Sequence, residues 1–210
     1  MKTQIDLRKI LFKYRSYIPI PFILLMIVFA KPTIYSIAGG LLVILFGEFI
    51  RLWGVSVAGS ETRTTKSVGS SLLVTSGPFS YLRNPLYFGN ICIYFGVGIM
   101  SWAAFPFLPI VTLSYFIFQY TLIVSLEEEH LTKTYGTEYQ RYLKAVPKFF
   151  PSFKKYKYSG HDQPQLDWRR GIKSEQRTFQ AILIIVFIIV VIWMLRFFYD
   201  WKITKLFGDA

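Results

Sequence analysis

The sequence predicts an all-α integral membrane protein with about five transmembrane helices, a short cytoplasmic amphipathic helix and basic cytoplasmic loops. Its 210 residues are 53% hydrophobic and 19% aromatic, and the apolar residues are gathered into runs near the length of about 20 residues that crosses a bilayer. The net charge is +12, but the basic residues lie almost wholly between these runs. Because a nucleic-acid-binding protein concentrates its basic residues on one folded face, we expect membrane lipids and no nucleic acid as partners.

Five apolar runs define the expected spans. They cover residues 17–30, 34–57, 85–100, 105–126 and 179–199. The first run is short for a span and ends at Lys31 and Pro32 without the small residues of a cleavage site, so we interpret it as an anchor and not as a signal peptide. The third and fourth runs are joined by an uncharged link and are expected to form a tight helical hairpin.

The second run carries features that are unusual in a membrane span. Gly39, Gly40 and Gly47 would allow a neighbouring helix to approach closely. Glu48 and Arg51 are separated by three positions and therefore share one helical face. Because charge inside a bilayer is costly, they form either a mutual ion pair near the membrane edge, with Arg51 extended toward the headgroups, or a polar wall of an active site.

The polar segment between the second and third runs is rich in Gly, Ser and Thr, so it is predicted to be a surface loop or a loop that lines a site. Gly77 and Pro78 mark a turn near its end. Asn84 followed by Pro85 predicts a helix start, since Asn caps free amides and Pro suits the first helical position. Arg83 would then lie at a helix N-terminus, where a fixed cation and helix-end amides can face a carboxylate.

The fourth helix is expected to continue past the membrane through the glutamates at 127–129 and to stop at Gly136 in a left-handed C-cap. A capping-box pattern at residues 137–140 then predicts a short amphipathic helix to about Ala145. Residues 148–168 are basic and interrupted by two prolines, so they predict an irregular segment.

Lysine and arginine set the expected orientation. The segment before the first run contains five of them, the polar loop three and residues 127–178 eleven, whereas the two links on the other side contain one and none. Because basic residues favour the cytoplasmic side, we predict a multi-pass protein with its N-terminus and its polar pocket on that side. The single cysteine excludes a disulfide framework, and two separated histidines without partner cysteines argue against a structural zinc site.

Without further comparison, these residues indicate only a multi-span protein with a cytoplasmic pocket lined by Arg, Glu and Tyr, because no dinucleotide-binding or phosphate-binding glycine motif is present. Three motifs sharpen this interpretation. They are Gly-Pro-Phe-x-x-x-Arg-Asn-Pro-x-Tyr at 77–87, Glu-Glu-x-x-Leu-x-x-x-Tyr-Gly-x-x-Tyr-x-x-Tyr at 127–142 and Val-Pro-x-Phe-x-Pro at 146–151. In this order, beside membrane spans, they resemble the isoprenylcysteine carboxyl methyltransferase family, which is grouped with the integral-membrane phospholipid methyltransferases.

The resemblance covers residues 57–151 and implies a division of the chain. Residues 1–56 would be N-terminal transmembrane helices, 57–151 a methyltransferase core, 152–178 a basic linker, and 179–210 an additional C-terminal transmembrane helix. The family commonly has His where this chain has Asn84, so a contact that depends on that His would be remade here.

The resemblance implies S-adenosylmethionine as methyl donor and a lipophilic, isoprenylcysteine-like carboxylate as acceptor. Arg83, or amides at the helix start, would take the donor carboxylate, and Glu127 or Glu128 its ammonium or ribose. Tyrosines would flank the adenine or donate hydrogen bonds. The expected catalytic residues are Arg83 and Glu128, and the expected cofactor-binding residues are Gly77, Pro78, Tyr81, Asn84, Pro85, Tyr87, Glu127, Tyr135, Tyr139 and Tyr142.

Other functions remain open at this point. In the same fold, a lipid amine could be N-methylated, with Glu128 as the base that removes a proton from the amine. A nicotinamide-dependent membrane reductase and a non-enzymatic transporter or scaffold are further alternatives. Arg83 could instead be a headgroup anchor, and Glu129 with Lys133 a simple i,i+4 pair. Tyr139 and the tyrosine three positions later could be one face of an interfacial helix.

Overall fold

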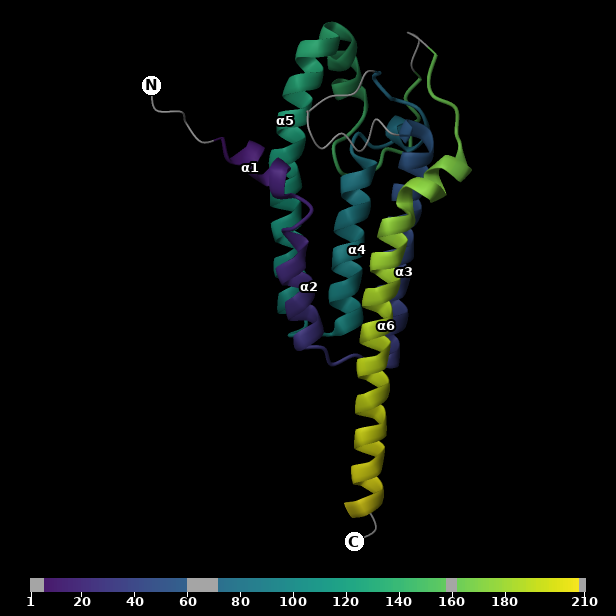
Figure 1. The fold of residues 1–210 in the computed structure, drawn as a ribbon. Helices are drawn as coiled ribbons and strands as arrows, with labels where there is room; N and C mark the ends of the chain where they lie inside the picture. Colours follow the sequence, from purple (N-terminus) through teal and green to yellow (C-terminus); the bar gives the residue numbers. More distant parts are fainter. Residues whose placement is uncertain (1–5, 60–71, 158–161, 208–210) are drawn as a thin grey trace.

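The computed structural model describes residues 6–59, 72–157 and 162–207, with side chains to 199, and these ranges contain helices and loops but no β-strand (Figure 1). The all-α prediction is therefore confirmed for the described chain. Its helices are α1 (Leu7–Tyr14), α2 (Pro19–Val28), α3 (Ile34–Ala58), the 3-10 helix η2 (Gly77–Ser80), α4 (Pro85–Ser101), α5 (Phe107–Ala145) and α6 (Trp168–Phe207).

Each predicted apolar run lies in a helix, but the helices differ in their capacity to span a bilayer. Within the described residues, α3, α5 and the Trp168–Tyr199 part of α6 are long and apolar enough to cross. The α1–α2 pair would add a fourth span if it is counted as one bent element, whereas α4 is apolar but has only 17 residues. Three to four candidate spans are therefore found, and a total of five stays a prediction.

The first run forms one helix, α2, and the polar helix α1 precedes it. α1 and α2 are bent by 58° at the break between them. Asp6 caps α1, because its carboxylate accepts from the Arg8 amide at 3.0 Å, and Pro19 starts α2 at a position that tolerates its missing N–H. Polar α1 thus turns across α5 while apolar α2 runs along the bundle (Figure 1).

Glycines set the distance between α3 and α4. A Cβ added to Gly40 would lie 2.5 Å from the Gly96 carbonyl oxygen, and one added to Gly47 would lie 2.7 Å from that of Gly89. No larger residue fits at such contacts, so the backbones approach directly. The predicted role of Gly40 and Gly47 is confirmed, but Gly39 has only Ile99 near it, at 4.0 Å.

The predicted hairpin of the third and fourth runs is confirmed, since α4 ends at Ser101 and α5 starts at Phe107 after a short turn. α5 then runs well past its apolar part. Gly136 interrupts its helical geometry as expected, but with φ 53° and ψ −124° it does not adopt the left-handed helical conformation that was predicted. The chain resumes helical structure at once, so the expected short helix is a bent extension of α5 that ends at Ala145.

α6 begins at Trp168, although residues 168–178 were expected to belong to a linker. These residues are polar, so hydropathy alone does not predict a helix here. The helix start is nevertheless marked by Asp167, whose carboxylate accepts from the Arg170 amide at 3.0 Å. The Asp167 amide in turn donates to the Ser56 carbonyl on α3 at 2.9 Å. α6 therefore runs antiparallel along α3, and it continues beyond the end of the other helices (Figure 1).

Candidate active site

The loop before α4 is hydrogen-bonded to the segment after α5. Three backbone bonds join them: Arg83 to Pro147 at 3.0 Å, Ser152 to Tyr81 at 2.8 Å and Tyr156 to Ser80 at 2.9 Å, each written with the amide donor first. The Tyr142 hydroxyl adds a fourth bond by donating to the Phe79 carbonyl at 2.7 Å. Two of the motifs recognised in the sequence, about sixty residues apart, thus form one folded unit at the end of the bundle.

Asn84 occupies the N-cap position of α4 and Pro85 its first turn, as predicted. The Asn84 side chain does not cap the helix, however. Its Nδ2 donates to the Lys148 carbonyl at 3.3 Å, so Asn84 stabilises the junction between the loop and the C-terminal motif. The expectation that its side chain satisfies a helix-end amide was wrong, since no side-chain hydrogen bond caps α4.

Gly77 and Pro78 form the first turn of η2, which packs against α3. Gly77 has φ +59°, a conformation that other residues rarely adopt, and an added Cβ would lie 2.6 Å from Val57 Cγ2. Pro78 is buried. Tyr81 is half-buried, with its ring centroid 6.3 Å from that of Trp53. These residues shape the loop, which then leads directly into Arg83.

Arg83, Glu128 and Lys148 form the charged centre of this unit. Glu128 accepts contacts from two cations, Arg83 Nη1 at 2.9 Å and Lys148 Nζ at 3.0 Å. The side chains of Arg83 and Glu128 are only 13% and 17% exposed. Glu128 Oε1 is thus held by the charge of Arg83. Arg83 Nε is buried and has no hydrogen-bond partner among the described residues, so one buried donor is available beside the ion pair.

The adjacent Glu127 points away from Arg83 and is hydrogen-bonded to Tyr87 instead. The Tyr87 hydroxyl on α4 donates to Glu127 Oε1 at 2.6 Å. The Tyr87 ring stacks on Tyr120 of α5 with centroids 4.7 Å apart, and Asn90 Nδ2 donates to the Tyr120 hydroxyl at 3.2 Å. Glu127 and Tyr87 thus face the helix core rather than the Arg83–Glu128 pair.

Tyr139 and Tyr142 lie on the bent extension of α5, beyond its apolar part, and each is only 3% exposed. They pack with Leu73 and Val146, and Tyr135 is partly buried against the same cluster. Burial raises the pKa of both the Tyr139 and Tyr142 phenols, so both remain neutral at physiological pH. The predicted alternative, an exposed face of an interfacial helix, is wrong for Tyr139 and Tyr142.

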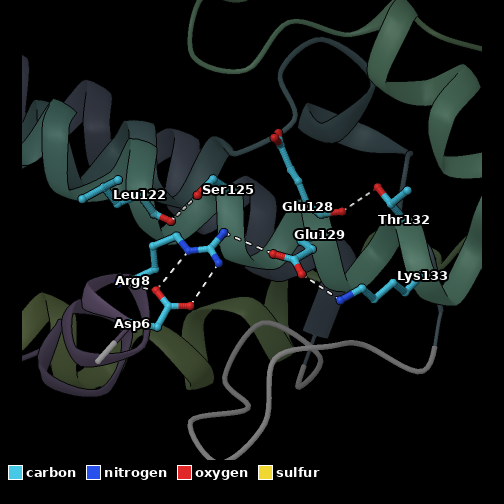
Figure 2. Close-up of polar contacts among 8 residues, drawn as sticks. All are labelled: Asp6, Arg8, Leu122, Ser125, Glu128, Glu129, Thr132 and Lys133. Carbon is cyan, nitrogen blue, oxygen red and sulfur yellow. Dashed lines mark hydrogen bonds and ion pairs between the residues drawn. The ribbon is translucent and has the colours of Figure 1, made fainter. Parts of the chain in front are cut away.

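Glu129 lies outside this unit and joins α1 to α5. Figure 2 shows it between Lys133, four positions along the same helix, and Arg8, while the Glu128 side chain points away from both. Glu129 contacts Lys133 Nζ at 2.7 Å and Arg8 Nη1 at 3.2 Å, and Arg8 also pairs with Asp6 at 3.0 Å. The predicted i,i+4 pair is confirmed, and three consecutive glutamates have three separate surroundings.

A second polar cluster lies inside the bundle, and the sequence indicated Glu48 and Arg51 as members but not Glu175. Arg51 Nη2 lies 2.8 Å from Glu175 on α6, and its Nε lies 3.6 Å from Glu48. The Arg51 side chain also donates to Asn90 on α4. Arg51 is 13% exposed and Glu175 1% exposed, so Arg51 does not extend toward the headgroups. Glu175 was missed because its stretch was assigned to a linker.

The structure therefore brings together Arg83, Asn84, Glu128, Tyr139 and Tyr142 and leaves Tyr87 with Glu127 as a neighbouring pair. Coulombic effects of Arg83 and Glu128 reach both buried phenols. Lys148 is the site residue that sequence reasoning missed. Its signal was weak, because one lysine in a strongly basic segment gives no indication of a specific partner.

Comparison with known proteins now bears on this unit. Residues 35–138 match the phospholipid methyltransferase family model. This match supports the family resemblance that the motifs indicated. The match includes α3, the loop, α4 and α5 as far as Glu138, and so contains Arg83 and Glu128.

Curated relatives point in the same direction. The chain is similar to the protein-S-isoprenylcysteine O-methyltransferases of Xenopus laevis (33% identity over 120 residues; 55% of this chain, 40% of the relative) and Rattus norvegicus (32% over 129 residues; 56% and 42%). It is also similar to the cobalt-zinc-cadmium resistance protein CzcN of Cupriavidus metallidurans (27% over 139 residues; 66% and 56%). The chain spans about half the length of these relatives. No solved structure matches it.

Proposed function

We propose that this protein is an S-adenosylmethionine-dependent methyltransferase of the membrane, which methylates the carboxylate of a lipophilic, isoprenylcysteine-like acceptor. The observation that carries the proposal is the enclosed Arg83–Glu128–Lys148 group, held between two motifs that resemble those of the membrane methyltransferases. The family match over residues 35–138 and the names of two relatives support it.

The charged group fits the amino-acid end of the methyl donor. That end carries a carboxylate and an ammonium on one carbon, and Arg83 and Glu128 present a guanidinium and a carboxylate side by side. Arg83 Nε, buried without a hydrogen-bond partner among the described residues, together with Lys148, would hold the carboxylate. Glu128, which pairs with Arg83 and Lys148 in the chain itself, would also accept from the ammonium. The amino-acid end of the donor would thus supply the hydrogen-bond partner that Arg83 Nε lacks among the described residues.

When bound, the donor supplies an activated methyl group. The chain's own residues contribute alignment and exclusion of water, which account for most of the acceleration available to an in-line displacement. The loop that carries Arg83 is fixed by Tyr142 and the three backbone bonds, so its guanidinium is positioned before binding. The buried phenols of Tyr139 and Tyr142 keep this wall apolar except for their hydroxyls.

A carboxylate acceptor is already ionised and requires no base, whereas an amine acceptor must first lose a proton. The matched family model, phospholipid methyltransferase, favours N-methylation of a lipid amine as the second candidate function. In that case Glu128 is the carboxylate best placed to take the proton. The distribution of Lys and Arg supports a cytoplasmic position for this site and five spans, with the bent α1–α2 pair and the short α4 both crossing.

The test is a binding measurement followed by an acceptor screen on the full chain in detergent or nanodiscs. Calorimetry with S-adenosylmethionine is expected to give saturable binding that Arg83→Ala abolishes and Arg141→Ala leaves intact, since Arg141 is exposed on the same extension of α5. Methyl-labelled donor is then offered a prenylated cysteine carboxylate or an aminophospholipid. Label in the first acceptor supports the leading proposal, and label in the second supports the alternative. Absence of saturable binding would refute both.

A further inference from the structure

A cavity lies at the opposite end of the bundle from the candidate active site. It has a volume of about 310 Å³ and is formed where the α2–α3 link meets the distal part of α6. The link contributes Lys31 and Thr33, and α6 contributes Trp193, Arg196 and Phe197. Two cations from segments far apart in the sequence thus converge on one hollow. This end lies outside the Arg83 unit, and the inference does not depend on the proposed function.

The register between α3 and α6 places this cavity in the bilayer. At one end, Arg51 of α3 contacts Glu175 and Thr178 of α6. At the other end, the start of α3 at Ile34 and Arg196 of α6 line the same cavity. Thr178 and Arg196 are separated by eighteen positions, or about 27 Å of helix at 1.5 Å per residue. This is close to the hydrocarbon thickness of about 30 Å, so the cavity lies at the headgroup level of the opposite leaflet.

The cavity is positively charged and has no acidic wall among the residues whose side chains are described. Lys31 is held in place by its backbone, because its amide donates to the Ser101 carbonyl at 2.8 Å. Neither Lys31 nor Arg196 forms an ion pair with a described carboxylate. Trp193 is half-buried beside them, at the depth where indole rings favour the membrane interface.

We propose that this cavity binds the phosphate-bearing headgroup of an anionic phospholipid, with the phosphate between Lys31 and Arg196. Trp193 lies one turn from Arg196 toward the hydrocarbon, so it contacts the glycerol and ester region. Ile34, which lies on the hydrocarbon side of Lys31, flanks the first segment of an acyl chain, and Phe197 packs beside Trp193. The lipid joins the α2–α3 link to α6, a helix whose apolar stretch is otherwise little buried against the protein.

The charge argument separates lipid classes. Lys31 and Arg196, which have no described carboxylate as partner, leave a net positive charge after they meet one phosphodiester, so a headgroup with no compensating ammonium is favoured over phosphatidylcholine. A free phosphate offers the same anionic oxygens but has no acyl chain for Ile34. A soluble phosphate ester without acyl chains therefore distinguishes a lipid site from a site for a small anion.

The experiment titrates the full chain in detergent with phosphatidylglycerol, phosphatidylcholine or sn-glycerol 3-phosphate and measures bound ligand by native mass spectrometry. Phosphatidylglycerol is expected to bind saturably and to dissociate as salt is raised. The Lys31→Gln/Arg196→Gln variant is expected to bind it about 30-fold more weakly, since each interfacial cation contributes about a factor of five. The Lys31→Arg/Arg196→Lys variant is expected to retain binding.

The matched control is Arg141→Gln/Lys144→Gln, which removes two exposed cations at the other end of the bundle and is expected to leave phosphatidylglycerol binding unchanged. Equal affinity of the Gln variant and the unaltered chain for phosphatidylglycerol would overturn the proposal. Competition by sn-glycerol 3-phosphate at similar concentrations would overturn the lipid assignment. If raised salt weakened the binding of phosphatidylglycerol and of phosphatidylcholine to the unaltered chain equally, the role of charge would be overturned, whatever the affinities of the variants.

Discussion

Exchanging Arg83 for lysine separates a binding role from a structural one. Lysine keeps the positive charge beside Glu128, so the ion pair at 2.9 Å can be remade. It loses the planar fork and the Nε donor, which is buried and has no hydrogen-bond partner among the described residues. Because the charge beside Glu128 is kept, Arg83→Lys is expected to have only a small effect on the free energy of unfolding.

The effect on the methyl donor is expected to be much larger. A hydrogen bond between charged groups contributes about 1.5–3 kcal/mol, and each 1.4 kcal/mol corresponds to about tenfold in affinity. Arg83→Lys should thus weaken S-adenosylmethionine binding by about 10- to 150-fold. The measurement is calorimetric titration together with thermal unfolding of the same preparations, with exposed Arg141→Lys as the matched control.

Two results would refute the reasoning about Arg83. Near-normal donor affinity in Arg83→Lys would show that its fork does not hold the carboxylate. Loss of thermal stability with unchanged affinity would show that Arg83 only fixes Glu128 and the loop. The backbone contact of Arg83 with Pro147 survives the exchange, so a misplaced loop would not by itself account for a binding defect.

Three further predictions test the surroundings of the site. Glu128→Gln keeps the shape but removes the charge, so donor affinity should fall about tenfold in calorimetry; full affinity would exclude an ammonium contact. Tyr142→Phe leaves the Phe79 carbonyl without its 2.7 Å donor and should lower the free energy of unfolding by about 1–3 kcal/mol in denaturant titration; an unchanged midpoint would contradict the loop clamp. Glu175→Gln weakens the buried contact with Arg51 and should lower the thermal midpoint while donor affinity is retained; a binding defect of equal size would place this cluster in the active site.

Much of the fold was accessible from sequence because membrane helices are specified locally. Long apolar runs, the Asn84–Pro85 start and the glycine break at 136 each depend on a few neighbouring residues, and each appears where it was predicted. The errors also have local causes. Polar residues 168–178 were assigned to a linker because that assignment depended on hydropathy. The polar helix α1 was not predicted because it lies before the first apolar run.

The site was less accessible because its geometry depends on contacts between segments that are distant in sequence. The motifs identified Arg83 and Glu128, but they did not indicate that the two pair with each other or that Lys148 joins them. The same holds for Glu127, which differs from Glu128 only by its position on the helix, about 100° away, and consequently faces Tyr87. Neighbouring residues on a helix point in different directions, so three consecutive glutamates could not be assigned one shared role.

The bent extension of α5 explains how a short membrane bundle can carry such a site. A straight helix of this length would carry residues 137–145 away from the loop, whereas the positive φ of Gly136 redirects them. Tyr142 can then reach the Phe79 carbonyl, and the chain that follows can bond to Tyr81 and Arg83. Gly136 has open space where a Cβ would lie, so its requirement for glycine comes from backbone conformation and not from packing. The position of Arg83 against Glu128 therefore depends on one backbone angle in a helix that otherwise follows its apolar sequence.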